Sequence, residues 1–238
     1  MERIWLDVPY SQKDQAKAAG ARWDAQARRW YAPRPQMPGL EPWAAAPPMP
    51  ELLPGEDRGF GSGLFVDLVP SNCWFSNARS CIDARDWERV RRMVLGRADQ
   101  RCEACGQTED RAISRWLEVH ERWTYDERKK VQSLRRLICL CSDCHGATHF
   151  GLAQVKGTDA AARAHLATVT GLDTRALDTH IRDAFALWSA RNRTSWSLNL
   201  DILTAGGIRL APPPAAKDRA GVADRELRRA RTEDLRRR

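Results

Sequence analysis

The sequence lacks any long hydrophobic run. Nowhere does it contain the roughly 18 consecutive apolar residues that a membrane-spanning helix needs. The N-terminal stretch MERIWLDVPYSQKDQ also lacks the apolar centre of a secretory signal. We therefore expect a soluble, cytoplasmic protein with no membrane partner.

Acidic side chains are in the minority. The 238 residues include 31 Asp and Glu against 39 Lys and Arg, which gives a net charge of +8. This balance favours a polyanionic partner such as nucleic acid, although a solvated basic surface has the same composition. A chain of this length can form one or two domains with hydrophobic cores.

Disulfides are not expected, because the cysteines are seven in number and four of them form two Cys-x-x-Cys pairs. Each pair can grip one side of a tetrahedral Zn²⁺ from a tight turn, and about 35 residues separate the pairs. The predicted structural zinc ligands are Cys102, Cys105, Cys141 and Cys144. The gap between Cys73 and Cys81 matches no common zinc-finger spacing, so we expect buried thiols there. Cys139 lies in the apolar run LICL and is expected to be a buried strand residue, with a spare metal ligand as the alternative.

Three of the five histidines accompany these pairs. His145 and His149 are four residues apart, so a helix that begins near Cys144 would place both on one face. Such a pair can bind a metal from one side. His120 lies in Trp116–Trp123, a run rich in β-formers, and can supply a third nitrogen from a strand. The pattern predicts a second metal site with open positions; a second structural role for the three histidines is the alternative.

The pattern C-x2-C … LEVHE … LC-x2-CH-x3-H, from Cys102 to His149, resembles the HNH (ββα-metal) endonuclease family in its zinc-ribbon-containing branch. The resemblance implies a β-hairpin followed by a helix, in a treble-clef-like zinc domain. It further implies one catalytic divalent ion (Mg²⁺, Mn²⁺, Ni²⁺ or Zn²⁺) held against a phosphate of DNA by His120, His145 and His149. By register with the family, Glu121 takes the place of the general base.

Two positions depart from the family pattern. Glu121 stands where a basic histidine is usual, and Arg136 stands where the family has an asparagine. A carboxylate with an ordinary pKa of about 4.3 is a weak base unless burial raises that pKa. We expect Arg136 to offset charge on the phosphate.

The beginning of the chain forms a unit of its own. Residues 1–32 are predicted to form a strand over Arg3–Val8, a helix from Ser11 to Ala19 and a strand over Arg28–Ala32. The run IWLDVPYSQKDQAKAAGARWDAQARRWYAP is similar to a small β-α-β domain of unknown function that is found fused to DNA-processing enzymes such as primases. Trp23 and Trp30 are expected to form its core, with base stacking as the alternative.

Composition divides the rest of the chain. Residues 33–63 are rich in proline and glycine and predict an extended linker without a core. Residues 64–210 are expected to form the zinc nuclease domain with its flanking helices, and residues 211–238 a charged flexible tail. Within that domain we expect a strand over Leu64–Val69, helices that begin at Asp83, Thr158 and Asp173, and an edge strand over Trp196–Leu203.

Two smaller expectations concern polar residues of this domain. Asp126–Arg136 reads as a basic loop, partly helical, suited to phosphate contacts. His165 and His180 have no clustered histidine or cysteine nearby in the sequence, so ordinary structural roles are expected.

The predicted protein is therefore an α+β chain with a small N-terminal β-α-β module, a Pro-rich linker and a zinc domain flanked by helices. Its predicted activity is metal-dependent hydrolysis of phosphodiester bonds, most simply in double-stranded DNA. A catalytically inactive, zinc-dependent nucleic-acid-binding module or adaptor is the main alternative. A protein-interaction module is a third.

Overall fold

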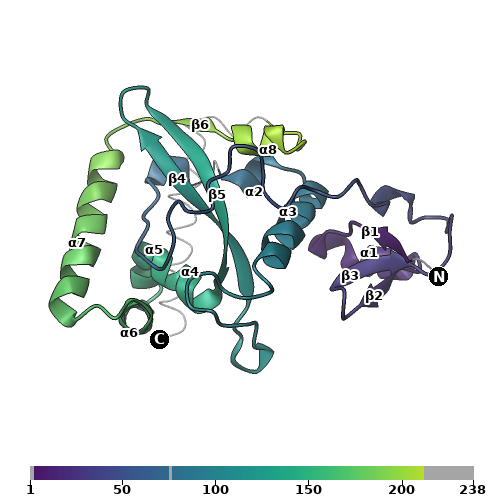
Figure 1. The fold of residues 1–238 in the computed structure, drawn as a ribbon, viewed down its shortest axis with the longest axis horizontal. Coiled ribbons are helices and arrows are strands. Elements are labelled where there is room, and N and C mark those ends of the chain that lie inside the picture. The colour runs from purple at the N-terminus through teal and green to yellow at the C-terminus, as the bar shows by residue number, and fades with distance from the viewer. Residues whose placement is uncertain (1–2, 75–76, 212–238) are drawn as a thin grey trace.

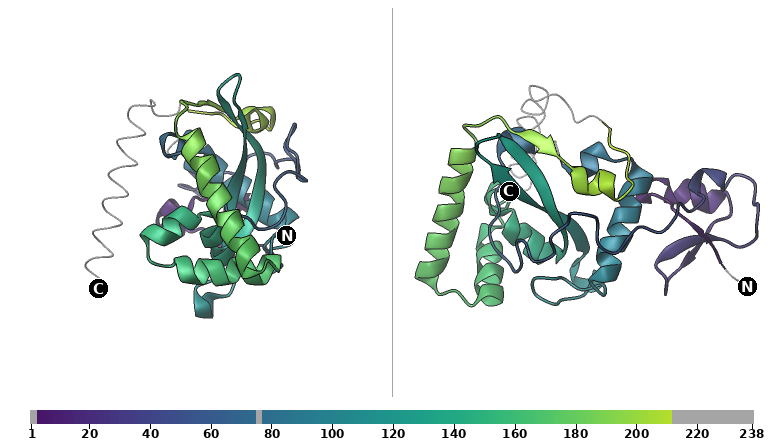
Figure 2. Two further views of the ribbon diagram at one scale, coloured as in Figure 1. Left: turned by 90° about the vertical axis from the view of Figure 1, so that its left-hand side faces the viewer. Right: turned by 45° about the horizontal axis from the view of Figure 1, so that its top comes forward.

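The computed structural model describes residues 3–74 and 77–211, so the predicted tail lies outside the described residues from residue 212 onward. The described chain is mixed α+β and contains two small three-stranded sheets, with strand orders β1-β3-β2 and β4-β5-β6. The N-terminal sheet lies beside α3, at the opposite end of the molecule from α7 (Figure 1; Figure 2, right).

The N-terminal module has one strand more than predicted. Its sheet is antiparallel with β3 in the centre, and consists of β1 (Ile4–Leu6), β2 (Arg22–Asp24) and β3 (Arg29–Ala32). The strand β2 was missed because it is only three residues long and carries two charged side chains. The helix α1 (Lys13–Ala18) begins two residues after Ser11, because residues 10–12 form a 3₁₀ turn that precedes it.

The core of this module differs from the predicted one. Trp23 is 49% exposed and Trp30 only packs against the core from its edge, so the pair does not form the module's centre. The buried cluster instead consists of Leu6, Val8, Ala16, Ala21, Ala32, Leu40 and Trp43. Leu40 and Trp43 come from the stretch that was expected to be a linker.

The rest of the proline-rich stretch is irregular but also contributes to a core. Leu53 is fully buried in the hydrophobic cluster of the larger domain. Glu56 is buried as well, and its two oxygens accept hydrogen bonds from Arg97 at 2.5 and 2.7 Å. The expectation of a spacer without a core is therefore wrong for these residues. Prolines prevent helix and strand formation, but they do not prevent side chains from being buried.

The helix α3 (Ala84–Arg97) begins where the sequence predicts, and follows the short α2 (Ala78–Cys81). Asp83 caps α3, since one of its carboxylate oxygens accepts hydrogen bonds from the backbone of Arg85 and Asp86. Val90 and Val94 are fully buried on the inner face of the helix.

A long hairpin forms the centre of the larger domain (Figure 1). Its strands are β4 (Leu117–Asp126) and β5 (Val131–Cys141), paired antiparallel with His120 opposite Ile138. The predicted basic loop is therefore confined to residues 127–130; Asp126 ends β4, and residues 131–136 belong to β5. The strand was missed because Gln132 and Arg136 are polar and yet buried.

The other elements surround this hairpin. The helix α4 (Ser142–Thr148) follows β5 without a gap, and α5 (Phe150–Val155), α6 (Asp159–Thr170) and α7 (Thr174–Arg191) come next. The predicted edge strand is shortened to β6 (Ser197–Asn199), which pairs parallel to β5, because the chain then turns into α8 (Asp201–Ala205).

The strand predicted over Leu64–Val69 does not form. Leu64 and Val66 are buried, but the segment joins neither described sheet, because its backbone bonds to other groups. The amide of Val66 donates to His180 Nε2 at 3.0 Å, and that of Asp67 to the carbonyl of Thr148. Among residues 3–74 and 77–211, no helix is both long and apolar enough to cross a membrane.

Candidate metal centre

The four paired cysteines converge between α3 and α4. Their sulfur atoms lie within 4.8 Å of one another, and only Cys105 is partly exposed. Cys102 and Cys105 occupy a turn closed by a hydrogen bond from the amide of Gly106 to the carbonyl of Cys102. Gly106 has a φ of +75°, which a glycine adopts without strain. Four sulfurs in this arrangement can hold a structural Zn²⁺.

The second pair stands at the junction of β5 and α4. Cys141 is the last residue of β5, and Cys144 lies in the first turn of α4. Hydrogen bonds from the thiols of Cys141 and Cys144 lower the pKa of Cys102, so this cysteine is the thiolate of the cluster. The same hydrogen bonds raise the pKa of Cys141 and Cys144. A metal bound here would fix the direction in which α4 leaves the hairpin.

The three predicted histidines also come together. His120 extends from the middle of β4, His145 lies in α4, and His149 follows the last residue of that helix. Their ring centroids are 4.6 to 5.3 Å apart, and their candidate ligand nitrogens lie within 4.8 Å of one another. The β-hairpin and the helix each contribute to this group, as the sequence indicated.

The environment keeps two of these imidazoles, those of His120 and His149, neutral. Burial lowers the pKa of His120 well below its usual range, and the neighbouring His149 lowers it further. Burial likewise lowers the pKa of His149 to about 3. Neutral imidazole is the form that coordinates metal ions. His120 Nε2 is buried and has no hydrogen-bond partner among the described residues, so the donor set fits a metal ion.

Glu118 belongs to this site, although the sequence analysis did not single it out. Its Oε2 lies 3.2 Å from His145 Nδ1, and this hydrogen bond is the main reason that the pKa of Glu118 is lowered. A carboxylate on one ring nitrogen is the usual means of orienting a metal-binding histidine. Glu118 is two residues before His120, so it lies on the same face of β4. This two-residue spacing is the sequence feature from which Glu118 could have been predicted to belong to the site.

Glu121 is half-buried and lies near the start of α2. Its Oε1 accepts a hydrogen bond from the amide of Ala78 at 3.0 Å. Burial raises the pKa of Glu121 to about 6, while the Ala78 amide and the charge of His145 act in the opposite direction. The carboxyl group therefore has the raised pKa that sequence reasoning required of a base at this position.

Arg136 is held by other protein groups and is not grouped with the histidines. It donates hydrogen bonds to the carbonyl of Phe60, to Ser62 Oγ and, at 2.9 Å, to Glu103 Oε1. Glu103 lies between the two cysteines of the first pair. The contacts of Arg136 therefore connect β5 with the cysteine cluster, and do not support the expected contact with phosphate.

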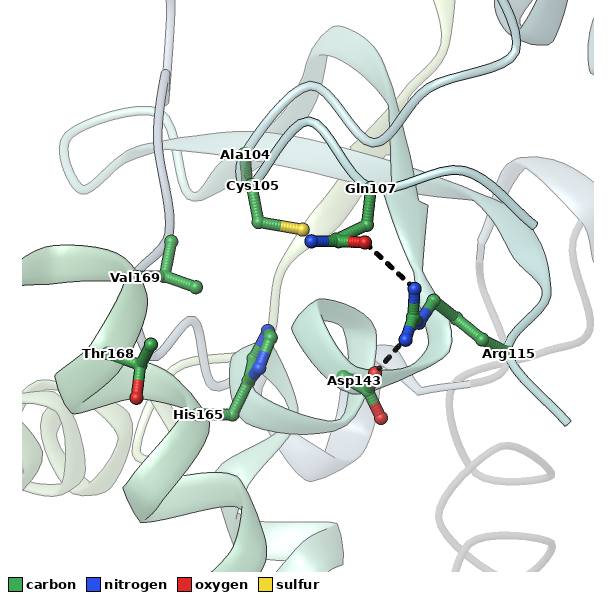
Figure 3. Close-up of a pocket in the computed structure, with 8 residues that line it drawn as sticks. All are labelled: Ala104, Cys105, Gln107, Arg115, Asp143, His165, Thr168 and Val169. Carbon is green, nitrogen blue, oxygen red and sulfur yellow. Dashed lines mark hydrogen bonds and ion pairs between the residues drawn. The ribbon is translucent and has the colours of Figure 1, made fainter. Parts of the chain in front are cut away.

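His165 has a partner that its neighbours in the sequence do not indicate. Its Nε2 lies 3.1 Å from Cys144 Sγ, beside the cysteine cluster. With Cys105, Arg115 and Asp143 it lines a pocket of about 500 Å³ (Figure 3). Local spacing contains no signal for this contact, because α6 brings the histidine to a cysteine 21 positions earlier.

The remaining predictions concern ordinary buried groups. His180 accepts the Val66 hydrogen bond, which is the structural role expected of it. The three cysteines outside the pairs are buried, and burial raises the pKa of Cys139 to about 12. Cys139 therefore stays a thiol, as predicted.

Known proteins resemble a short part of the chain. Residues 3–44 match a family model described as a domain of unknown function (DUF5710). Two DNA primases TraC of Escherichia coli are 59% and 56% identical to the chain over 32 residues, which is 13% of this chain. The match spans only 3% and 2% of the length of these primases. No solved structure matches the chain.

Proposed function

We propose that this chain is a metal-dependent endonuclease that hydrolyses phosphodiester bonds of DNA at the three-histidine site. The main support is the convergence of His120, His145 and His149, with the Nε2 atom of His120 buried and without a partner in the described structure. Leaving a buried polar atom unsatisfied costs about 1–3 kcal/mol, and a bound divalent ion removes that cost. The hairpin followed directly by α4 is the arrangement expected of the HNH family.

The donor set narrows the choice of ion. Three imidazoles suit Zn²⁺ or Ni²⁺ better than Mg²⁺ or Mn²⁺, which prefer oxygen ligands. A divalent ion bound there would supply Lewis-acid stabilisation of the charge that develops on the phosphate. Residues of the chain itself would accept the proton of the attacking water and hold the metal ligands in position.

Each residue of the site has a distinct task in this proposal. Glu121, close enough to His145 for that ring to lower its pKa, would accept the proton of the attacking water. Glu118 would hold the ring of His145 in a fixed orientation. The cysteine cluster, with Zn²⁺ bound, would keep α4 in place relative to β4, and with it the spacing of the three rings.

Nucleic acid is supported as the substrate by charge. The chain carries a net charge of +8, and the exposed tip of the hairpin presents Arg128, Lys129 and Lys130. Cations at such positions neutralise backbone phosphates without reading sequence. The similarity of a short segment to DNA primases supports DNA over RNA.

A catalytically inactive nucleic-acid-binding module or adaptor is the second candidate. Two observations favour it: the carboxylate of Glu121 is engaged by the Ala78 amide, and Arg136 is engaged by Glu103. Either contact would reduce what these side chains can offer to a phosphate or to water.

A plasmid-cleavage assay separates the two. The full chain is incubated with supercoiled plasmid, single-stranded DNA or RNA, and with Zn²⁺, Ni²⁺, Mn²⁺ or Mg²⁺ in turn. The endonuclease proposal expects nicking of plasmid that His145→Ala abolishes and the matched control His180→Ala retains. Binding of DNA without cleavage of any substrate, with any of these ions, would instead support the inactive module.

A further inference from the structure

One face of the N-terminal sheet carries aromatic side chains that the core of the module does not use. The strand register places Trp5 opposite Tyr31, and Tyr31 opposite Arg22. Because side chains alternate along a strand, these three residues lie on one face of the sheet. The buried residues Leu6 and Ala32 lie on the other face, which also carries Trp23.

The same face is rich in arginine. The rings of Trp5 and Tyr31 are half-buried and meet edge to face, with centroids 6.3 Å apart. The guanidinium carbon of Arg3 lies 5.2 Å from the centre of the Tyr31 ring, and that of Arg29 lies 5.4 Å from the centre of the Trp5 ring.

One arginine of this face is left to bind an anion. Arg3 is already paired with Asp24, which lies on the same face, and Arg29 with Asp7. Arg22 is exposed and makes no ion pair with any residue in the described part of the chain. Over residues 3–44 as a whole, seven Lys and Arg stand against four Asp and Glu. The module is therefore net basic, and this face combines two aromatic rings with three guanidinium groups, of which that of Arg22 has no carboxylate partner among the described residues.

We propose that this face, consisting of Arg3, Trp5, Arg22, Arg29 and Tyr31, binds single-stranded nucleic acid. Open sheets bind single strands when aromatic side chains stack on unpaired bases and nearby cations neutralise the phosphates. A duplex buries the faces of its bases in its own stack, so it cannot use the two rings in this way. This site is separate from the three histidines and does not depend on the cleavage reaction.

Fluorescence anisotropy with labelled oligo(dT), oligo(U) and a duplex of equal length tests the proposal. Every protein is the full chain carrying His145→Ala, so that cleavage cannot obscure binding. The double substitution Trp5→Ala/Tyr31→Ala is expected to weaken binding of single strands about tenfold or more. The matched control is Trp23→Ala, a half-exposed tryptophan on the opposite face, which should leave the affinity unchanged. Arg22→Gln should reduce the slope of log affinity against log salt by about 1.

Equal binding of oligo(dT) and oligo(U) would fit stacking on any base, and a preference for one would identify the natural strand as DNA or RNA. The proposal fails if the folded double variant binds as tightly as its parent, if Trp23→Ala weakens binding equally, or if only the duplex binds.

Circular dichroism establishes whether the double variant is folded. Should the double variant not fold, photocrosslinking of the unsubstituted rings to bromouridine-containing oligonucleotides replaces it. Crosslinks are then expected at Trp5 or Tyr31, and crosslinks confined to other residues would overturn the proposal.

Discussion

Glu118 and His145 connect β4 with α4 through a contact of 3.2 Å between Oε2 and Nδ1. The contact restricts rotation of the imidazole of His145. One ring of the three-histidine site, that of His145, is therefore oriented before any ion is bound. A substitution of Glu118 therefore removes the orientation of His145 without removing a metal ligand.

Glu118→Ala is accordingly expected to weaken binding of a divalent ion at the histidine site by about 10- to 100-fold, because His145 loses its orienting partner. Isothermal titration with Ni²⁺ or Mn²⁺ measures this. The control is Glu127→Ala, an exposed glutamate at the tip of the same hairpin, which should bind like the parent. An unchanged affinity in Glu118→Ala would show that the contact does not orient the ligand.

The proposed zinc site predicts that substitution of Cys102 and substitution of Cys139 have different effects on zinc content. Cys102→Ala removes a candidate zinc ligand and should release the zinc and unfold the region around α4, because the sulfurs hold the hairpin and helix together. Cys139→Ala removes a buried thiol outside the cluster and should retain the zinc, at a cost of about 1 kcal/mol in stability. Zinc content after gel filtration and thermal unfolding provide the measurements. Equal zinc loss in both variants would contradict the assignment.

Glu121 is the proposed base, and an isosteric substitution tests it. Glu121→Gln keeps an oxygen that can accept the Ala78 hydrogen bond, but it cannot take a proton. We expect cleavage to slow by about 10²- to 10⁴-fold while the affinity for the divalent ion remains unchanged. Single-turnover cleavage of a labelled duplex measures the rate. A rate equal to that of the parent would remove Glu121 from the reaction and leave the metal site intact.

Asp7 predicts how stability depends on pH. Its burial opposes ionisation, but the amide of Ala46 and the cations of Arg92 and Arg29 outweigh burial, so the pKa of Asp7 is lowered. Because the folded-state pKa lies below the unfolded value of about 3.9, the stabilisation is present at neutral pH and is lost as pH falls below about 4.

The test compares parent and Asp7→Asn by urea unfolding over a range of pH. At pH 7 the variant should be less stable by about 2 kcal/mol, since it weakens the charge-assisted hydrogen bond from Arg92, which joins the N-terminal module to α3, and the one from Arg29 within the module. The difference should shrink below pH 4. A difference that is independent of pH would mean that the charge of Asp7 is not the cause.

The sequence identified the parts of the site that depend on local spacing. Cys141, Cys144, His145 and His149 lie within nine positions, so one strand end and one helix bring them together. Glu118 was overlooked, although its spacing from His120 on a strand offered a signal. His165 could not have been found in this way, because its position beside Cys144 depends on how α6 packs against α4.

Long-range partners also explain the errors in the fold. Arg136 resembled a phosphate-binding residue because its sequence neighbours are basic, but Glu103, 33 positions earlier, holds it inside the domain. Proline-rich residues around Leu53 resembled a linker because composition reports on backbone conformation and not on burial. In both cases the decisive contact joins residues that are distant in the sequence.

The central claim is that His120, His145 and His149 share one divalent ion. A crystal structure of the full chain grown with Ni²⁺, with anomalous scattering collected at the nickel edge, tests it most directly. The account predicts an anomalous peak about 2.0–2.2 Å from one nitrogen of each ring, a typical distance for imidazole coordination. The absence of a peak there, with the three rings turned apart or bonded to other protein groups, would contradict it.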